Sequence, residues 1–511
     1  MQIRTHAKDR LAGRLRHALP AALVAVLVAL VAPRPVTLDP RTTGNDELAK
    51  RLRQVTGGRG HLGLAVGLVD GATVQTAGVG LTGGDPDTTV TAETPFEIGS
   101  VTKVFNGMLL ADMVADERIT PQTTLRELYP GTRFADSEVG GITLAELASH
   151  RAGLPRVAPD GLQGLLHAVR AEWTGADPYR AKEADDLLAT AASVEIDGKG
   201  DYAYSNFGAA LLGHALAHRA GTTYPELVRE RILDPLGMSS TILSGDAAPP
   251  PGYARPHRAG GQQVAPWLGT GHAPAGAGVW STASDLVRLV TAVRDGTAPG
   301  SQAAQPRWSA GDAGQRVGFA WHVTDYDGRQ VTWHNGATGG SSSFVGFTGD
   351  RAVVLLGNTD RSVDATALRL LGVAVADDES VLPERQYLML LLTVLLPPLA
   401  AVTMIGRGIR RRTAGFRPAP DRAVLLNATV SGALLLLVVW RAGLWQVVPP
   451  LLWTASTAVY LLGCALAVRR WRELSASGSR SAWRHQASLA FTCLLAGSYL
   501  AVLVTTLSVL D

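Results

Sequence analysis

Residues 97–103 read EIGSVTK, which places a serine and a lysine three positions apart where an apolar, helix-like run begins. The lysine is one of only five in a chain that holds 42 arginines. An ammonium group can lose its proton whereas a guanidinium group stays charged, so a lysine in this background is informative. The stretch therefore predicts a nucleophile, Ser100, and its proton acceptor, Lys103.

The local pattern also has a plainer interpretation. Helical spacing after EIGS places Ser100 at the amino end of a helix, where free backbone N–H groups favour negative charge. Lys103 then lies one turn further along on the same face. A serine before a helix is commonplace, so an N-cap serine followed by a solvated lysine would explain this stretch equally well. The choice between the two depends on the rest of the chain.

Two further motifs follow in order. Tyr204 and Asn206 form the only Tyr-x-Asn in the sequence, 104 residues after Ser100, and they precede a second helix-like run. His334 and Gly336 form a His-x-Gly at the end of a strand-like run, 130 residues after Tyr204. A second His-x-Gly occurs near the N-terminus, so the third motif is weak alone. The order and spacing of all three motifs favour a catalytic site.

With these motifs, the chain resembles the penicillin-recognising serine hydrolases. The resemblance is to the class C β-lactamase-like branch, with its D,D-carboxypeptidases, D-aminopeptidases and esterases. It covers most of residues 45–375, including ITLAELASHRAGLP, ILDPLGMSST and PAGAGVWSTASDLVRLV. It implies an α/β (α+β) fold: an antiparallel sheet flanked by helices, a mostly helical subdomain inserted after the Ser100 helix, and an active site between them.

A serine hydroxyl needs a base to remove its proton during attack. Lys103 can act as that base if burial lowers its pKa, and Tyr204 can do so if Lys103 stabilises a phenolate. The two would titrate as a coupled pair, so both assignments stay open. The resemblance implies that Asn206 orients Lys103 and binds a substrate carbonyl. It also implies an oxyanion hole from the backbone N–H groups of Ser100 and Ala337, worth about 3 kcal/mol per donor.

The third motif departs from the family pattern. It reads His-Asn-Gly, where lactamase and carboxypeptidase members usually carry a central hydroxyl residue that helps bind the substrate carboxylate. Asn335 therefore puts β-lactam and D-Ala-D-Ala substrates in doubt. His334 stands where many relatives have lysine, and an ordinary imidazole is protonated only below about pH 6.5. We expect activity on carboxylate substrates to decline above that pH. Gly336, in the glycine-rich run that follows, would let a substrate lie against the strand edge.

Metal and nucleotide chemistry are weakly indicated. His214 and His218 in HALAH share one helix face, but the sequence offers neither an HExxH glutamate nor a clear third ligand. The run GATGGSSS lacks the Gly-Lys-Ser/Thr ending of a phosphate-binding loop. We therefore expect no metal and no cofactor.

Apolar segments lie at both ends of the chain. Residues 1–32 combine a basic region with about 15 apolar residues, as in a cleaved signal peptide or an uncleaved signal anchor. After a domain at 33–386, the region 387–511 holds four uncharged stretches long enough to cross a bilayer. These predicted spans are 387–405, 423–440, 449–468 and 487–510.

The charge distribution predicts the orientation of these spans. Net charge is +4 for residues 1–32, −10 for 33–386 and +9 for 387–511. The loops at 406–422 and 469–486 carry six and five arginines, so the positive-inside rule makes both cytoplasmic. Their place beside spans indicates topology rather than a nucleic-acid partner. The domain at 33–386 is then extracytoplasmic in a multi-pass membrane protein. It contains no cysteine and needs no disulfide.

Together these features predict a membrane-anchored serine hydrolase that forms an acyl-enzyme. Its substrate would be a small molecule or peptide bearing an amide, D-peptide, ester or β-lactam bond, and cell-wall and lipid-linked substrates stay open. The alternative is a catalytically weak, acyl-accepting receptor, or a protein whose spans associate with a membrane partner. Predicted cytoplasmic loops of about 17 residues are too short for an output domain, which disfavours the receptor.

Overall fold

The computed structural model describes residues 26–58, 60–132, 137–159, 161–180, 183–243, 248–311, 314–375, 384–409 and 422–474. The chain divides into two compact units. Val36–Ser380 forms the larger unit, which carries all three motifs. The smaller unit combines the N-terminal segment with the region after Ser380.

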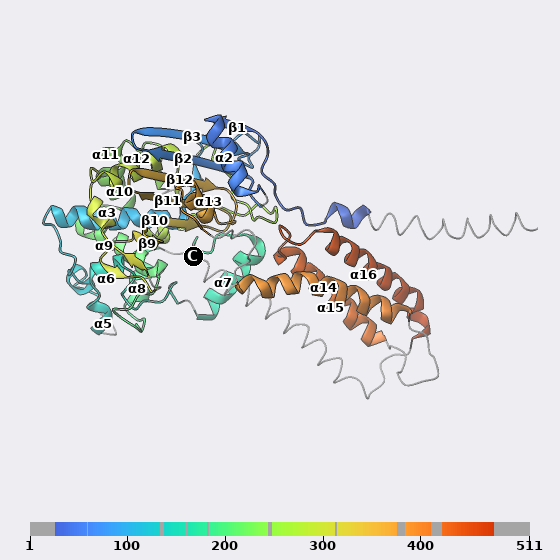
Figure 1. Ribbon diagram of the computed structural model, residues 1–511. Helices are drawn as coiled ribbons and strands as arrows, with labels where there is room; N and C mark the ends of the chain where they lie inside the picture. Colours follow the sequence, from blue (N-terminus) through green and yellow to red (C-terminus); the bar gives the residue numbers. More distant parts are fainter. Residues whose placement is uncertain are drawn as a thin grey trace, which may run out of the picture. The chain divides into compact units, whose positions relative to one another are not determined.

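A nine-stranded antiparallel sheet forms the centre of the larger unit (Figure 1). Its strand order is β1-β3-β2-β12-β11-β10-β9-β8-β7, so the first and last parts of the domain meet where β2 pairs with β12. The strands are β1 (Thr42–Gly44), β2 (Gly63–Asp70), β3 (Thr73–Gly80), β7 (Trp308–Ser309), β8 (Gln315–Val317), β9 (His322–Tyr326), β10 (Arg329–Ala337), β11 (Ser342–Thr348) and β12 (Arg351–Gly357). A small second sheet pairs β4 (Phe96–Glu97), β6 (Val279–Ser281) and β5 (Ile242–Leu243).

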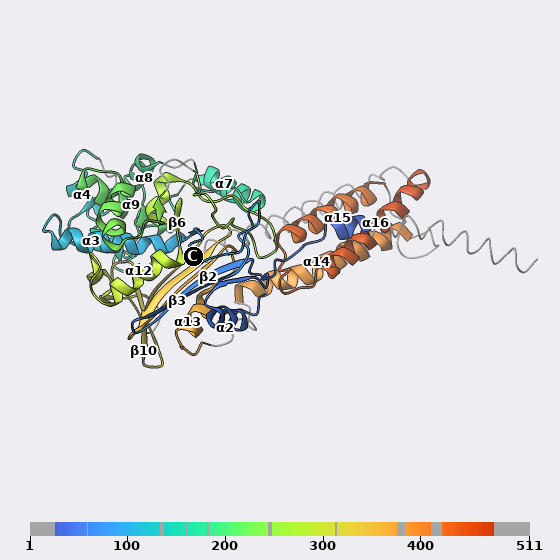
Figure 2. The same ribbon diagram turned by 90° about the horizontal axis from the view of Figure 1, so that it is seen from above.

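Side chains along the central strands point alternately to the two faces of the large sheet, so a hydrophobic core forms on each face. Leu64 and Val66 of β2 lie in a cluster with α2 (Asp46–Thr56) and α13 (Asp364–Leu370). Ala65, between them, faces the opposite cluster, since successive strand side chains point to opposite faces. That second cluster includes α3 (Lys103–Ala115) and α12 (Ala283–Arg294). Figure 2 shows α12 on one side of the sheet and α2 with α13 on the other.

The chain between α3 and β5 forms the inserted helical subdomain, as the resemblance implied. Its elements are α4 (Leu125–Leu128), α5 (Ser137–Gly140), α6 (Leu144–Ala148), α7 (Gly161–Thr174), α8 (Ala184–Ala191), α9 (Asn206–Ala220), α10 (Tyr224–Val228), the π-helix η2 (Arg229–Leu233) and α11 (Asp234–Leu236). Outside the insert, the larger unit contains the 3₁₀ turns η1 (Gly99–Thr102), η3 (Thr270–Ala275) and η4 (Ser301–Ala304). The insert lies against α3, which follows directly on η1, the turn that carries the predicted nucleophile.

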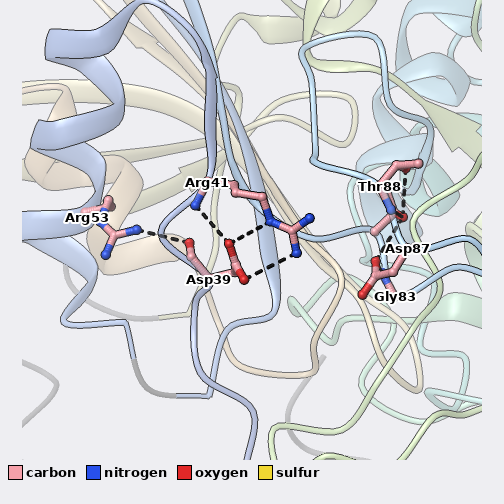
Figure 3. Close-up of polar contacts among 7 residues, drawn as sticks. Asp39, Arg41, Arg53, Gly83, Asp87 and Thr88 are labelled. Atoms are coloured by element: carbon pink, nitrogen blue, oxygen red, sulfur yellow. Dashed lines mark hydrogen bonds and ion pairs between the residues drawn. The ribbon is translucent and has the colours of Figure 1, made fainter.

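Polar contacts secure the segment that leads into β1 at the edge of the sheet (Figure 3). The Asp39 carboxylate accepts hydrogen bonds from the backbone N–H of Arg41 at 2.9 Å and from its guanidinium at 3.0 Å. Arg53 of α2 donates to the Asp39 carbonyl at 3.0 Å. The Arg41 guanidinium lowers the pKa of Asp39, so the contact stays ionised at neutral pH. These hydrogen bonds therefore connect the segment that leads into the edge strand β1 to helix α2.

Three long helices form most of the described part of the smaller unit: α14 (Glu384–Ile409), α15 (Arg422–Ala442) and α16 (Leu451–Arg470), followed by the turn η5 (Trp471–Glu473). Within them, Tyr387–Ile409, Val424–Ala442 and Leu451–Arg470 are long and apolar enough to cross a membrane. They match the first three predicted spans, whereas the predicted fourth span, 487–510, lies outside the described residues. Residues 26–30 are helical, and Trp440 of α15 donates from Nε1 to the Val31 carbonyl at 2.7 Å.

Candidate active site

Ser100 and Lys103 form the pair that their spacing predicts. Ser100 lies in the 3₁₀ turn η1, and Lys103 is the first residue of α3. The Lys103 Nζ atom lies 2.7 Å from Ser100 Oγ and also donates to the Ala275 carbonyl at 2.9 Å. Lys103 is only 1% exposed. The alternative of a solvated lysine is therefore wrong, because this amine is buried against the serine hydroxyl.

The end of β10 contacts the backbone of the nucleophile turn. A Cβ atom on Gly336 would lie 2.1 Å from the Ile98 carbonyl oxygen, so only glycine allows this approach. Gly99 has a φ of +49°, and a Cβ there would lie 2.7 Å from the Ala337 carbonyl oxygen. Ser343 of the next strand donates from Oγ to the Ile98 carbonyl at 2.7 Å. These contacts bring Ser100 and Ala337 to the lining of one cleft.

His150 positions the stretch that carries Tyr204. Its carbonyl accepts from the Ala203 N–H at 2.8 Å, and its Nδ1 atom accepts from the Ser205 N–H at 3.2 Å. The backbone of His150 is left-handed, with a φ of 57°, which is an uncommon conformation for a residue other than glycine. Its ring also packs on Tyr204 with a centroid separation of 4.3 Å. A strained residue thus holds the second motif from two sides.

Tyr204 lies close to two basic side chains. The Lys103 Nζ atom is 5.1 Å from the centroid of the Tyr204 ring, and the Arg156 guanidinium carbon is 5.2 Å from it. Both cations contact the ring within the range of cation–π interactions. Lys103 is therefore near both Ser100 and Tyr204, as a coupled nucleophile–base group requires.

Asn206 is the first residue of α9, and Ser205 caps this helix by accepting the Gly208 N–H at 2.9 Å. The cap fixes the direction in which the Asn206 side chain leaves the helix. Its Oδ1 atom is buried and has no hydrogen-bond partner among the described residues. Asn206 lines the same cleft as Ser100. Its amide can therefore serve a group that enters this cleft.

His334 is fully buried, with His322 and Tyr204 as neighbours. Its ring centroid lies 5.3 Å from that of His322 and 6.5 Å from that of Tyr204. Burial lowers the pKa of His334 well below its ordinary value, and the charges of nearby His322 and Lys103 lower it further. Burial likewise lowers the pKa of His322 to about 4. The expectation that His334 titrates near pH 6.5 is therefore wrong, because that value belongs to a solvated imidazole.

Asn335 does not point toward the nucleophile. Its Nδ2 atom donates to a carboxylate oxygen of Asp364 at 2.7 Å, and Asp364 begins α13. Because neighbouring strand residues face opposite sides of a sheet, His334 and Asn335 diverge. The central residue of the third motif therefore contacts a helix on the far face of the sheet.

Comparisons with known proteins identify the family of this chain. A family model described as Beta-lactamase matches residues 48–377. The chain belongs to the beta-lactamase family. Solved class C beta-lactamases share its fold, including one from Rhodobacter sphaeroides with a TM-score of 0.53 and 22% identity, covering 64% of this chain and 98% of that one. A beta-lactamase/D-alanine carboxypeptidase from Pseudomonas syringae has a TM-score of 0.54 and 19% identity, covering 65% of this chain and 99% of that one.

Curated relatives are more varied in their names. An unguisins hydrolase from Aspergillus campestris is 25% identical over 64% of this chain and 64% of its own length. The D-alanyl-D-alanine-carboxypeptidase/endopeptidase AmpH of Escherichia coli is 29% identical over 45% of this chain and 57% of its own length. Penicillin-binding protein 4 of Amycolatopsis lactamdurans is 26% identical over 50% of this chain and 69% of its own length. The chain thus spans less than two thirds of the first two of these relatives.

Three aromatic side chains that belong to none of the sequence motifs are also part of the candidate site. Tyr179, Trp267 and His272 line the cleft beside Ser100 and Asn206. The Tyr179 ring lies 5.0 Å from Trp267 and 4.5 Å from His272, centroid to centroid. We call these three residues the aromatic wall. No motif marks them, since Tyr179 is about 90 residues from Trp267 and His272 in the sequence.

His214 and His218, on one face of α9, do not line the cleft beside Ser100. The Nε2 atom of His214 is 2.8 Å from the Gly271 carbonyl oxygen, and that of His218 is 3.1 Å from the Leu128 carbonyl oxygen. His218 also stacks on Tyr129 at 4.5 Å. Each imidazole therefore contacts a different backbone segment. Within the described ranges, no three side chains are grouped as ligands for a metal ion.

Proposed function

We propose that this protein is a membrane-anchored serine hydrolase in which Ser100 forms a covalent acyl-enzyme. The observation that carries the proposal is the buried Lys103 amine, 2.7 Å from the Ser100 hydroxyl. Membership of a family of serine hydrolases supports the reaction class. The three apolar helices of the smaller unit support attachment to a membrane.

The proposed reaction gives a part to the Ser-x-x-Lys and Tyr-x-Asn motifs and to the backbone of Ala337. Ser100 Oγ attacks the substrate carbonyl while its proton moves to Lys103, directly or through Tyr204. The backbone N–H groups of Ser100 and Ala337 stabilise the developing oxyanion, and Asn206 holds the substrate carbonyl group. The leaving group departs with the transferred proton. Water then attacks the acyl-enzyme ester and releases the acid and free Ser100.

The cleft favours an uncharged substrate. The side chains that line it are aromatic, small or amide groups. The neighbouring Lys103 amine is buried and contacts Ser100 and the Ala275 carbonyl. His334 is neutral near pH 7, and Asn335 is bonded to Asp364, so the third motif offers a carboxylate no charge. Esters and internal amides therefore fit better than peptides with a free carboxylate beside the scissile bond. A panel of esters, D-peptides and a chromogenic β-lactam, tested on the full-length protein in detergent, checks this preference.

The pH dependence of substrate choice tests the role of His334. The ratio of kcat/KM for a carboxylate-bearing substrate to that for its neutral ester should stay constant from pH 6 to pH 8. The reason is that His334, with its strongly lowered pKa, does not change charge in this range. His334→Lys should raise the ratio by adding a cation, provided that the buried lysine stays protonated. A ratio that falls through pH 6.5 in Glu97→Gln, which lacks the buried carboxyl group that titrates near pH 7 beside this site, would show that His334 is solvated and titrates there.

Cysteine accessibility tests the orientation of the spans. In a background with Cys464 and Cys493 replaced by alanine, Ala414→Cys and Gly478→Cys should resist an impermeant maleimide on intact cells. Ser362→Cys, on the exposed surface of the larger unit, should react. The expectation rests on the arginines of the two loops. Labelling of the loop cysteines in intact cells, with protection of Ser362→Cys, would show that the orientation is opposite to the one proposed.

A further inference from the structure

A buried carboxyl group lies directly behind the nucleophile turn. Glu97 of β4 precedes Ser100 by three residues and is 2% exposed. Its Oε1 atom accepts the Trp267 backbone N–H at 2.8 Å. Its Oε2 atom accepts from the hydroxyl groups of Thr338 at 3.2 Å and Ser341 at 3.4 Å. The reaction proposed above assigns this residue no part.

These donors come from two parts of the site: Trp267 from the cleft lining, and Thr338 and Ser341 from the turn between β10 and β11. Trp267 is in the aromatic wall, and Thr338 directly follows Ala337, whose N–H is the proposed oxyanion donor. Ser341 closes the turn between β10 and β11, where the Thr338 N–H donates to the Ser341 carbonyl at 2.9 Å. The Glu97 carboxyl group thus links three parts of the site. They are the nucleophile turn η1, the end of β10 that carries Ala337, which we call the oxyanion strand, and the aromatic wall.

A second carboxylate holds the same wall from its other end. Asp177 accepts the Leu268 N–H at 2.7 Å and the Tyr179 N–H at 2.8 Å. Glu97 and Asp177 therefore bind the adjacent backbone N–H groups of Trp267 and Leu268. The position of the wall depends on two carboxyl groups rather than on regular secondary structure.

We propose that ionised Glu97 is a positioning residue, which holds the oxyanion strand and the aromatic wall against the Ser100 turn, and that its protonation loosens this arrangement. The proposal rests on the proposed function, since it concerns the geometry in which Ser100 is acylated. An ionised carboxylate accepts all three hydrogen bonds. A protonated one must use an oxygen as a donor, so one of the two hydroxyl groups has to turn.

Glu97 changes charge in the range where such an effect can be measured. Burial raises the pKa of Glu97 to about 7, although the hydrogen bonds from Trp267, Thr338 and Ser341 favour its ionised form. The charge of Asp177 raises the pKa of Glu97 further. Tyr253 also lies close enough for the Glu97 charge to act on it, and burial keeps the pKa of that phenol above its ordinary value. Below pH 7 the neutral form of Glu97 therefore predominates.

The rate of covalent labelling at Ser100 tests the proposal. Full-length protein in detergent is treated with a neutral phosphonate ester between pH 5.5 and pH 8.5, in native form and as Glu97→Gln. Glutamine keeps the shape of protonated glutamate and cannot ionise. The ratio of native to variant rates should rise from about 1 at low pH to about 10 at high pH, with its midpoint near pH 7. The shared titration of Lys103 and Tyr204 cancels in this ratio.

Glu93→Gln is the matched control, since Glu93 is exposed, lies four residues away and undergoes the same chemical change. Its rates should follow the native profile. Equal pH profiles for native protein and Glu97→Gln would overturn the proposal while leaving Ser100 as the nucleophile. Undiminished labelling of Ser100→Ala would instead overturn the proposed function.

Hydrogen exchange gives a readout that is independent of labelling. At pH 8, the backbone amides of Trp267 and Leu268 and of residues 337–342 should exchange several-fold faster in Glu97→Gln than in Glu93→Gln. Amides in the core of α12 should not differ, which separates local loosening from loss of the fold. Unchanged exchange in both segments would overturn the positioning role, whatever the labelling shows.

Discussion

Ser100→Ala should abolish covalent labelling by a fluorophosphonate and reduce turnover of any accepted ester by roughly 10⁴- to 10⁶-fold. The size of the loss follows from the chemistry, because without an acyl-enzyme only binding and oxyanion stabilisation remain. The change removes one oxygen atom from a residue that is 7% exposed. We therefore expect the melting temperature to change little.

Ser309→Ala is a suitable control for this experiment, since Ser309 is exposed on β7 at the sheet edge. It should label at the native rate. Label found on a different serine in Ser100→Ala would refute the assignment of the nucleophile. A native protein that is acylated at Ser100 but never turns over would support the acyl-accepting receptor instead.

The fold could be predicted through the resemblance to a known family, and three short motifs that encode local geometry supplied the candidate site residues. Ser100 and Lys103 are one helical turn apart, and Asn206 and Gly336 sit where a helix begins and a strand ends. Such positions depend on a few neighbours in the chain. Three of the seven predicted residues line one cleft and the other four lie beside them, although their catalytic roles stay predictions.

Properties set by tertiary surroundings could not be predicted in the same way. The lowered pKa of His334 comes from burial and from charges on β9 and α3, which no local pattern reveals. The aromatic wall is formed by Tyr179, Trp267 and His272, and only folding brings these three together. Glu97 stands inside the motif EIGSVTK, yet its role depends on donors that are 170 to 244 residues away. For Glu97, a charged residue in an otherwise apolar strand was the available signal.

Lys103→Arg should reduce labelling at Ser100 by about 10²- to 10⁴-fold, although it preserves the positive charge. A guanidinium group cannot accept the serine proton at accessible pH, and it is larger than the amine in a site that is only 1% exposed. Lys50→Arg makes the same change on the exposed surface of α2 and should label normally. Normal labelling of Lys103→Arg would exclude Lys103 as the base.

The comparison with Lys103→Met separates the two possible bases. If Lys103 takes the proton, arginine and methionine should lower the labelling rate equally, because neither can act as a base. If Tyr204 takes it, the cation serves only to stabilise the phenolate, so Lys103→Arg should label faster than Lys103→Met. The Lys103 amine lies 5.1 Å from the Tyr204 ring centroid, close enough for such stabilisation. Because the amine lies closer still to Ser100 Oγ, at 2.7 Å, we expect the two variants to be equally slow.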